Sequence, residues 1–180
     1  VGLPGTWRWV LLGAGLLLWA QLALGGWVST NYAVLACPDF PTCGGEWMPP
    51  WNGLGFDLWR PLGRAASGEW LAMSALMSIH FVHRSMAWLV LGVLGLLAWR
   101  LHRVPGLVRP ARTLSALLLL QLATGISNVV LGWPLLAAVL HTGGAAALVM
   151  VLTWTAARAR AFSFCASVAV PEADSARACA

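Results

Sequence analysis

Charged residues are scarce in this sequence of 180 residues, where Asp, Glu, Lys and Arg together make up only 9% of the chain. A soluble globular protein devotes roughly a quarter of its residues to charge, because charged side chains cover its water-facing surface. Residues of the set AVILMFWYC contribute 59% here instead. This composition excludes a soluble globular domain and a disordered chain, and it predicts a protein that lies within the lipid bilayer.

Lysine is absent, so all 11 basic residues are arginine, and they outnumber the 6 acidic residues to give a formal net charge of +5. A positive balance is typical of nucleic-acid-binding proteins, but those proteins need a dense basic surface. A chain with so little total charge cannot supply such a surface. We therefore expect membrane lipid, and no nucleic acid, among its partners.

Acidic residues are missing from four apolar stretches, each long enough to cross a bilayer as a helix, which takes about 20 residues. The stretches cover residues 9–28, 79–99, 114–131 and 135–157. They lack the strict alternation of membrane β-strands, and backbone groups in lipid must bond within their own segment. We expect an all-α, integral membrane four-helix bundle over residues 1–161, followed by a disordered cytoplasmic tail at residues 162–180.

The charged residues outside the spans are distributed unevenly. The connection between the second and third spans holds four arginines and no acid, whereas the long first connection, residues 29–70, holds four acids against two arginines. By the positive-inside rule, both termini and the arginine-rich connection lie in the cytoplasm or the matrix. Residues 29–70 and the tight Gly132-Trp133-Pro134 turn then face outward. In a bacterial inner membrane, the location that we expect, this is the periplasmic side.

Two of the four cysteines lie close together in the long connection, as Cys37 and Cys43. Disulfides persist in an oxidising compartment, so we expect this pair to be bonded, which restricts the unfolded chain by roughly 2 kcal/mol. Two unpaired thiols, or half of a metal site, are the alternatives. Cys165 and Cys179 belong to the cytoplasmic tail, and we expect them to be free thiols.

Ionisable side chains inside a span are costly in lipid, so each indicates a functional position. His83 and His141 both come out roughly 6–10 Å below the outer surface when each residue is counted as 1.5 Å of helix. Two imidazoles at one depth on different helices suit bis-His axial ligation of a haem iron. Hydrogen bonding between helices, with no metal involved, is the alternative for such histidines.

Two neighbours of His83 extend this hypothesis. Arg84 is placed to reach a haem propionate through charge-assisted hydrogen bonds. His80 shares a helical face with His83, so it is an alternative ligand or a partner of His141 in a di-His metal site. Zinc takes three or four ligands and the spans supply no carboxylate or cysteine, which favours haem. Trp88 is expected to pack rather than to contact a cofactor.

A short internal echo relates the first and third spans. Residues 21–25 read Gln-Leu-Ala-Leu-Gly and residues 121–125 read Gln-Leu-Ala-Thr-Gly, and the span after each carries a histidine toward its outer end. The echo suggests two similar helical hairpins. Gly143 and Gly144, beside His141, are expected to leave room for a flat macrocycle. The polar side chains expected to hydrogen-bond between helices are Gln21, Thr124, Ser127 and Asn128.

Four short segments stand out along the chain. Residues 26–31 read Gly-Trp-Val-Ser-Thr-Asn, and residues 36–43 read Ala-Cys-Pro-Asp-Phe-Pro-Thr-Cys. The segment Ile-His-Phe-Val-His-Arg at residues 79–84 and the segment 124–134, which leads to His141, follow them. In these motifs and in their order the chain closely resembles the haem A synthase family. Members of this family are membrane enzymes built as two similar four-helix halves. They oxidise the C8 methyl group of haem o to the formyl group of haem a, for cytochrome oxidase.

The resemblance is to the C-terminal half of that family, which holds a b-type haem. It implies that His83 and His141 are the axial ligands of haem b and that haem o is the substrate of the whole enzyme. It also implies that Cys37 and Cys43 are the outer-loop cysteines of the family. The implied partners are an N-terminal catalytic half or further copies of the chain, haem o synthase, and cytochrome oxidase assembly proteins.

One position departs from the family's pattern. In the N-terminal half of the family, a Glu implicated in catalysis stands three residues before the His-Arg pair, and His80 occupies that place here. We therefore expect the haem b half of an enzyme rather than a self-sufficient one. Because Val1 is not an initiator methionine, we expect a fragment or a processed product. Two other functions stay open: a stand-alone bis-His b-type cytochrome that exchanges electrons with quinone, and a haem-free structural or assembly protein.

Overall fold

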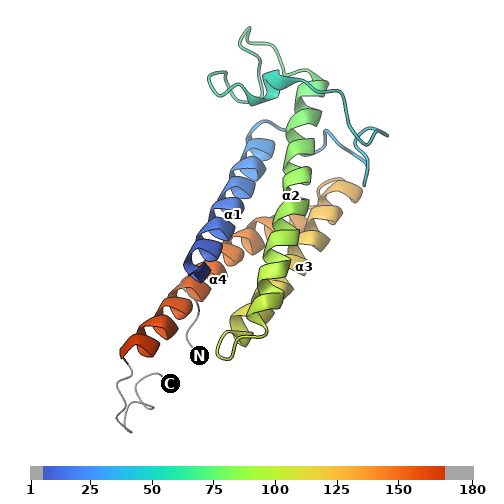
Figure 1. The fold of residues 1–180 in the computed structure, drawn as a ribbon. Coiled ribbons are helices and arrows are strands. Elements are labelled where there is room, and N and C mark those ends of the chain that lie inside the picture. Colours follow the sequence, from blue (N-terminus) through green and yellow to red (C-terminus); the bar gives the residue numbers. More distant parts are fainter. Residues whose placement is uncertain (1–5, 169–180) are drawn as a thin grey trace.

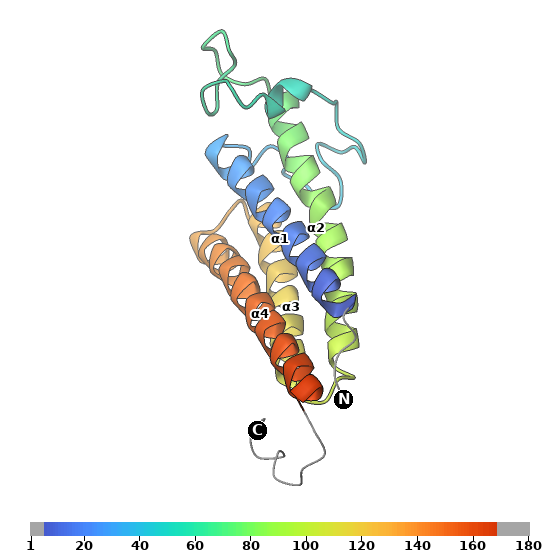
Figure 2. The same cartoon turned by 60° about the vertical axis from the view of Figure 1, so that its left-hand side comes forward.

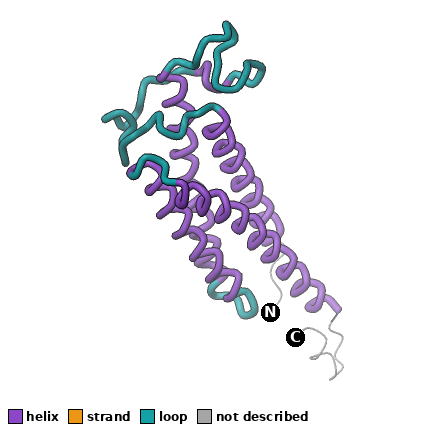
Figure 3. Tube along the Cα trace, turned by 180° about the vertical axis from the view of Figure 1, so that it is seen from behind, coloured by secondary structure: helices purple, strands orange, loops and turns teal. Residues whose placement is uncertain are grey.

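The computed structural model describes the backbone of residues 6–168 and the side chains of residues 6–159. Within residues 6–168 it contains four α-helices, one short 3₁₀ helix and no β-strand (Figure 3). The elements are α1 (Thr6–Thr30), η1 (Gly53–Phe56), α2 (Met73–Leu101), α3 (Val108–Val130) and α4 (Leu135–Val168). Each α-helix is long and apolar enough to cross a membrane. The all-α membrane bundle predicted from composition is therefore confirmed.

The helices stand side by side in a bundle (Figure 1, Figure 2). α1 packs against α2 and α4, and α3 packs against the same two helices. Consequently α2 and α4, which carry the predicted histidine ligands, lie diagonally across the bundle. The start of α1 and the short turn between α2 and α3 lie toward one end, whereas the long connection between α1 and α2 lies at the other (Figure 1).

α2 begins at Met73, six residues before the start predicted at residue 79. Its first turns pack on the long connection, because Ala75 and Ile79 belong to an apolar cluster that the connection completes. The backbone N–H of Asn52 also donates to the Ser78 hydroxyl at 2.9 Å. Tertiary contacts therefore support helical turns that hydropathy does not mark. α3 also begins earlier than predicted, at Val108 instead of residue 114. Hydropathy locates the lipid-embedded part of a helix and does not mark its polar first turn.

α4 continues to Val168, so residues 162–168 are helical where the start of a disordered tail was expected. The sequence from Trp154 to Val168 contains neither glycine nor proline and is rich in alanine and arginine, which favour helix. The rest of the predicted tail, residues 169–180, lies outside the described residues. The Cys179 thiol and the Cys165 side chain lie outside them as well, so the expectation of free thiols there stays a prediction.

Arg60 anchors the long connection to the end of α1. The residue is 6% exposed, and its guanidinium donates to Oδ1 of Asn31 at 2.8 Å and to the carbonyl oxygen of Gly55 at 2.7 Å. It also lies 5.5 Å from the ring centroid of Trp27. Burial lowers the pKa of Arg60 from its ordinary value. The connection is thus a folded cap on the bundle, held by buried polar contacts.

Between α3 and α4 the chain reverses in a tight turn, as predicted. Gly132 and Trp133 both have positive φ, at 66° and 65°, and the Trp133 N–H donates to the carbonyl oxygen of Asn128 at 2.8 Å. Pro134 follows, and its carbonyl oxygen accepts from the Ala138 N–H at 3.0 Å in the first turn of α4. Proline suits this place because its missing N–H has no partner in a first helical turn.

Two apolar clusters hold the bundle together and leave space between them. Along α2, the cluster nearer the long connection ends at Ile79, and the larger cluster toward the opposite end begins at Val90. The residues between them, from His80 to Leu89, include His80, His83, Arg84, Ala87 and Trp88, which line a cavity. The site is therefore a gap in the core that is surrounded by close packing at both ends.

Candidate functional site

A cavity of about 550 Å³ lies within the bundle and is lined by residues from all four α-helices. Its volume falls in the range of about 300–1,000 Å³ that is typical of small-molecule sites. His80, His83 and His141 all line it, so the structure brings together the three intramembrane histidines of the predicted site. Because α2 and α4 are diagonal, His83 and His141 approach the cavity from opposite sides. His102, the fourth histidine of the chain, is exposed and lies 3.4 Å from the Ser115 hydroxyl.

A glutamine of the neighbouring helix holds each of these two histidines. Gln21 lies 3.2 Å from Nδ1 of His83 and donates to the His83 carbonyl oxygen at 3.2 Å. Gln121 donates to the His141 carbonyl oxygen at 2.9 Å. Gln21 stands nine residues before the end of α1 at Thr30, and Gln121 stands nine residues before the end of α3 at Val130. The echo in the sequence therefore corresponds to one contact made twice, at the same level of two hairpins.

The second hairpin adds a hydroxyl that orients its imidazole. The Thr124 hydroxyl donates to the Leu120 carbonyl oxygen at 2.7 Å and lies 3.0 Å from Nδ1 of His141. Since its hydrogen is engaged with Leu120, the hydroxyl oxygen accepts from Nδ1–H. The other ring nitrogen of His141, Nε2, then carries no hydrogen, which is the form in which an imidazole binds a metal.

In the first hairpin Leu24 stands where the echo has Thr124, and no hydroxyl is available at that position. Gln21 reaches Nδ1 of His83 itself. Its Oε1 is buried and has no hydrogen-bond partner among the described residues. Because the two ends of an amide are assigned by their hydrogen bonds, turning this amide over would let Oε1 accept from Nδ1–H. The single difference within the echo thus explains why the two histidines have different partners.

Glycines of α1 and α3 make room for the two imidazoles. A Cβ atom added to Gly25 would lie 3.2 Å from Cε1 of His83, and one added to Gly125 would lie 3.3 Å from Cε1 of His141. Gly143 and Gly144 were instead expected, from their place beside His141, to make space for a macrocycle. That interpretation is wrong, because neither lines the 550 Å³ cavity and Gly144 faces Gln121 instead. Gly25 and Gly125 both stand at the last position of the echo, and this shared position could have identified them from the sequence.

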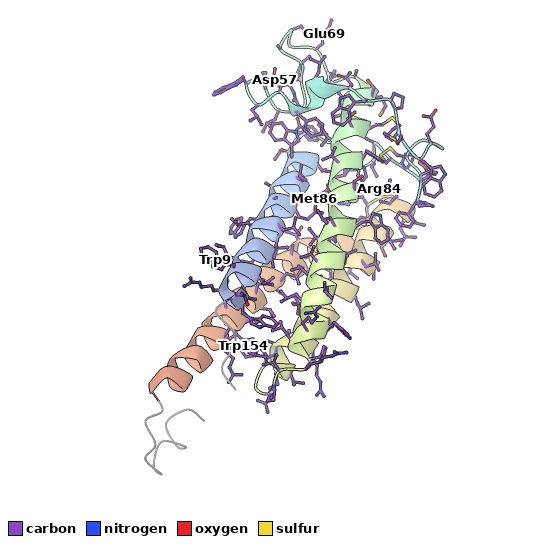
Figure 4. All side chains as sticks on the ribbon, viewed as in Figure 1. Trp9, Asp57, Glu69, Arg84, Met86 and Trp154 are labelled. Carbon is purple, nitrogen blue, oxygen red and sulfur yellow. A yellow bond between two sulfur atoms is a disulfide. The ribbon has the colours of Figure 1, made fainter. Side chains whose placement is uncertain are left out.

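Arg84 joins the cavity to the long connection between α1 and α2. Cys37 and Cys43 form the predicted disulfide, and Nη2 of Arg84 donates to the Asp39 carbonyl oxygen at 2.9 Å within the loop that they close. The guanidinium also lies 5.3 Å from the ring centroid of Phe40. Figure 4 shows Arg84 on α2 below the disulfide-bearing part of the connection. Sequence reasoning placed Arg84 at the cavity but did not foresee its bonds to the loop.

The loop closed by the disulfide is further ordered by Asp39. Its carboxylate accepts hydrogen bonds from the Thr42 hydroxyl and from the backbone N–H groups of Gly44, at 2.6 Å, and Gly45, at 2.9 Å. The bond from Thr42 is the main reason that the pKa of Asp39 is lowered to about 2. The carboxylate therefore acts as a fixed acceptor around which the loop turns.

Within the described residues, no group of three His, Cys, Asp or Glu side chains is placed to hold a metal ion. The donors gathered at the cavity are imidazoles, which is the set of axial ligands that an iron already held in a macrocycle requires.

A profile of the COX15-CtaA family, whose description is cytochrome oxidase assembly protein, matches residues 2–153 of the chain. The chain belongs to this family. Heme A synthase of Shewanella oneidensis is 44% identical over 139 residues, which cover 76% of this chain and 42% of that protein. Heme A synthase of Rhizorhabdus wittichii is 29% identical over 150 residues, or 79% and 38% of the two chains. The chain thus spans less than half the length of these relatives. No solved structure matches it.

Two residues at the site of this COX15-CtaA chain were missed by sequence reasoning. Phe40 of the loop and Trp88 of α2 both line the cavity, with their ring centroids 6.3 Å apart. Trp88 was expected only to pack. Trp88 stands one helical turn beyond Arg84 on α2, and this spacing could have indicated that it shares the cavity-facing side of the helix. The contact with Phe40, 48 positions earlier, appears only in the folded chain.

The other intramembrane polar residues of the COX15-CtaA chain behave differently from one another. Gln21 and Thr124 bond between helices, as expected. The expectation was wrong for Ser127, whose hydroxyl donates to the Ala123 carbonyl oxygen of its own helix at 2.8 Å. A serine satisfied within its helix needs no partner elsewhere. Asn128 lines the cavity, and its Oδ1 is buried with no partner among the described residues.

Proposed function

We propose that this chain is the haem b-binding half of a haem A synthase, with His83 and His141 as the axial ligands of the iron. The observation that carries the proposal is the pair of imidazoles that face one cavity from diagonal helices. Each has a glutamine and a glycine of the neighbouring helix against it. His80 also lines the cavity, but no residue of α1 in the echo holds it in this way, so we assign ligation to His83.

The residues present fit a haem. A flat ring between His83 and His141 needs small residues beside the imidazoles, which Gly25 and Gly125 provide. It also needs a ligand nitrogen without hydrogen, which Thr124 secures on His141. When bound there, haem b supplies one-electron redox chemistry. The protein supplies the binding, the orientation and the exclusion of water.

The oxidation of haem o is proposed for a second unit, an N-terminal catalytic half or another copy of the chain. The named relatives are more than twice as long as the segments they share with this chain. In addition, His80 cannot serve as a carboxylate, and residues 79–99 contain no acid. The present chain then binds haem b and braces the unit in which the C8 methyl group of haem o becomes the formyl group of haem a.

We also propose that the disulfide-bearing connection is periplasmic and that both termini are cytoplasmic. The arginines of the α2–α3 turn support this orientation, because they lie at the end of the bundle opposite the connection (Figure 1). A phosphatase reporter that is active only in the periplasm should be active when fused within residues 44–52 and inactive when fused within residues 102–107. The reverse pattern would refute this orientation.

The haem assignment is tested by spectra of the chain purified in detergent. Wild-type protein should show a low-spin bis-His spectrum and give protohaem in pyridine haemochrome analysis. His83→Ala and His141→Ala should each abolish the bis-His spectrum, whereas His102→Ala, which alters an exposed histidine outside the cavity, should leave it unchanged. An unaltered spectrum in both cavity variants would refute the ligand assignment.

The same preparation separates the proposed function from the two alternatives. A colourless protein that does not take up haem b would indicate a structural or assembly protein. A haem-loaded chain that never supports conversion of haem o to haem a, even together with the N-terminal half of a relative, would indicate a b-type cytochrome. Formation of haem a only when both halves are present is the result expected here.

A further inference from the structure

Two buried polar atoms of α2 have no hydrogen-bond partner among the described residues, namely Nδ1 of His80 and Nη1 of Arg84. The His80 side chain is only 5% exposed, and both residues line the cavity. A buried polar atom without a partner has lost its hydrogen bonds to water without replacing them, which destabilises the empty cavity. Such atoms in a cavity therefore indicate where a polar group of a ligand belongs.

The charge of Arg84 points to the sign of that group. Its Nη2 donates to the carbonyl oxygens of Asp39 and Pro41, at 2.9 and 3.4 Å, and these acceptors are neutral. The Asp39 carboxylate attracts Arg84 through space, but its hydrogen bonds come from the Thr42 hydroxyl and two backbone N–H groups. Among the described residues, Nη1 of Arg84 therefore has no acceptor at hydrogen-bonding distance. A cation within a membrane span normally meets an anion. An acidic group of the ligand would serve that purpose.

The two unpartnered atoms lie on one side of α2 and at one end of the cavity. His80 and Arg84 are four residues apart, so their side chains are neighbours one helical turn apart. Arg84 reaches the loop closed by Cys37 and Cys43, and Phe40 of that loop lines the cavity. The unpartnered atoms therefore stand where the cavity meets the outer loop, beyond the imidazole of His83.

We propose that His80 and Arg84 together bind one carboxyl group of the ligand, which for haem b is a propionate. This inference rests on the proposed function, because it takes haem b as the ligand of the cavity. A carboxylate accepts from Nη1–H of Arg84 in a charge-assisted hydrogen bond. The imidazole of His80 also has a hydrogen bond with the Ala33 backbone, which engages the other ring nitrogen because Nδ1 is the unpartnered one. A proton held between Nδ1 and a carboxyl oxygen then completes the contact with the ligand. His80 is then a positioning residue that orients the macrocycle.

The test compares haem b with its dimethyl ester, in which neither propionate can ionise. The purified full chain is titrated with each compound, and the dissociation constant is read from the Soret band of the bis-His form. Wild-type protein should bind the ester about tenfold more weakly than haem b. His80→Leu should bind haem b about tenfold more weakly and the ester with unchanged affinity. His80→Asn, which keeps a polar atom near the place of Nδ1, should recover part of the loss.

His102→Leu is the matched control, since it removes an exposed histidine at the far end of the same helix. It should retain the wild-type preference for haem b over the ester. Equal affinity of the wild-type chain for both compounds, with an intact bis-His spectrum, would overturn the propionate site and leave the proposed function standing. A His80→Leu variant that loses the bis-His spectrum with both compounds would also overturn it, because His80 would then be the ligand. A wild-type chain that binds neither compound would refute the proposed function itself.

Discussion

Gly25 of α1 lies against His83 of α2 so closely that an added Cβ atom would stand 3.2 Å from Cε1 of the imidazole. Gly125 and His141 repeat this relationship at 3.3 Å in the second hairpin. Contacts of this length are tighter than ordinary van der Waals separation, so the imidazole can keep its position only if these residues have no side chain. The two glycines therefore set where the rings stand in the cavity.

Gly25→Ala and Gly125→Ala should each displace one imidazole and weaken haem b binding by about tenfold. The fold itself should not suffer, since alanine favours helix over glycine by up to about 1 kcal/mol. Haem titration and thermal unfolding of the haem-free protein measure the two effects separately. Gly15→Ala on α1, where an added Cβ meets nothing within 4 Å, is the control and should retain wild-type affinity. Unchanged affinity in both test variants would contradict the proposed positioning.

Thr124→Val should weaken haem binding by about 10- to 100-fold, the usual effect of removing the outer hydrogen bond of a ligating histidine. Valine keeps the branched shape but cannot accept from Nδ1–H of His141, so the ring loses its fixed tautomer. Haem titration gives the affinity, and the reduction potential gives an independent measure. Thr153→Val is the matched control, because that hydroxyl bonds only its own helix, at the Val149 carbonyl oxygen, and is exposed. Equal effects of the two substitutions would argue against the Thr124 bond.

Two adjacent glycines of α4 should respond differently to alanine. A Cβ at Gly144 would collide with the Gln121 amide, whereas one at Gly143 meets nothing within 4 Å. Gly144→Ala should therefore push Gln121 away from the His141 carbonyl oxygen and lower the melting temperature of the bundle. Gly143→Ala should leave it unchanged or raise it slightly. Circular dichroism during heating distinguishes the two outcomes, and similar melting temperatures would contradict the close packing of α3 on α4 at Gln121.

Replacing both Cys37 and Cys43 by serine should remove about 2 kcal/mol of stabilisation from the loop that they close. The loop carries Phe40 at the cavity wall and the carbonyl oxygens that bind Arg84, so haem should leave faster from the variant. Transfer of haem to an external haem-binding protein measures that rate. A chain lacking Cys165 and Cys179 instead should release haem at the wild-type rate. An unchanged rate in the Cys37 and Cys43 variant would show that the loop does not retain the haem.

The loop should also respond to acid in a defined range. The pKa of Asp39 is about 2 in the folded loop against 3.8 for a free aspartate, so the carboxylate stabilises the loop fully above pH 3.8. This contribution is lost as the pH falls through about 2. The NMR shifts of the Gly44 and Gly45 amides, which donate to the carboxylate, should titrate with that midpoint and should not titrate in Asp39→Asn. A midpoint near 4 would contradict the hydrogen bonds.

Much of the fold could be predicted from single stretches of sequence. A bilayer selects long apolar helices, so four spans follow from hydropathy, and His83 and His141 stand out because ionisable groups are rare in lipid. The disulfide follows from two cysteines separated by five residues. The rotation of each helix about its own axis cannot be predicted from such a stretch. Gly143 and Gly144 were assigned to the cavity because they flank His141 in sequence, and the actual rotation turns Gly144 toward Gln121.

By itself, the sequence determined that this chain resides in lipid, how many helices it supplies, which ionisable groups they carry and that two hairpins echo one another. These features depend on the free-energy cost of exposing polar atoms to hydrocarbon, and each segment avoids that cost through its own residues and its own helical hydrogen bonds. The tertiary structure decided which glutamine meets which histidine and which glycines make room for the rings. It also decided that Arg84 binds the loop closed by the disulfide while one of its nitrogens has no partner among the described residues. Those outcomes depend on the packing of segments up to 62 positions apart, as with Gln21 and His83. Only the folded bundle brings such segments within hydrogen-bonding distance.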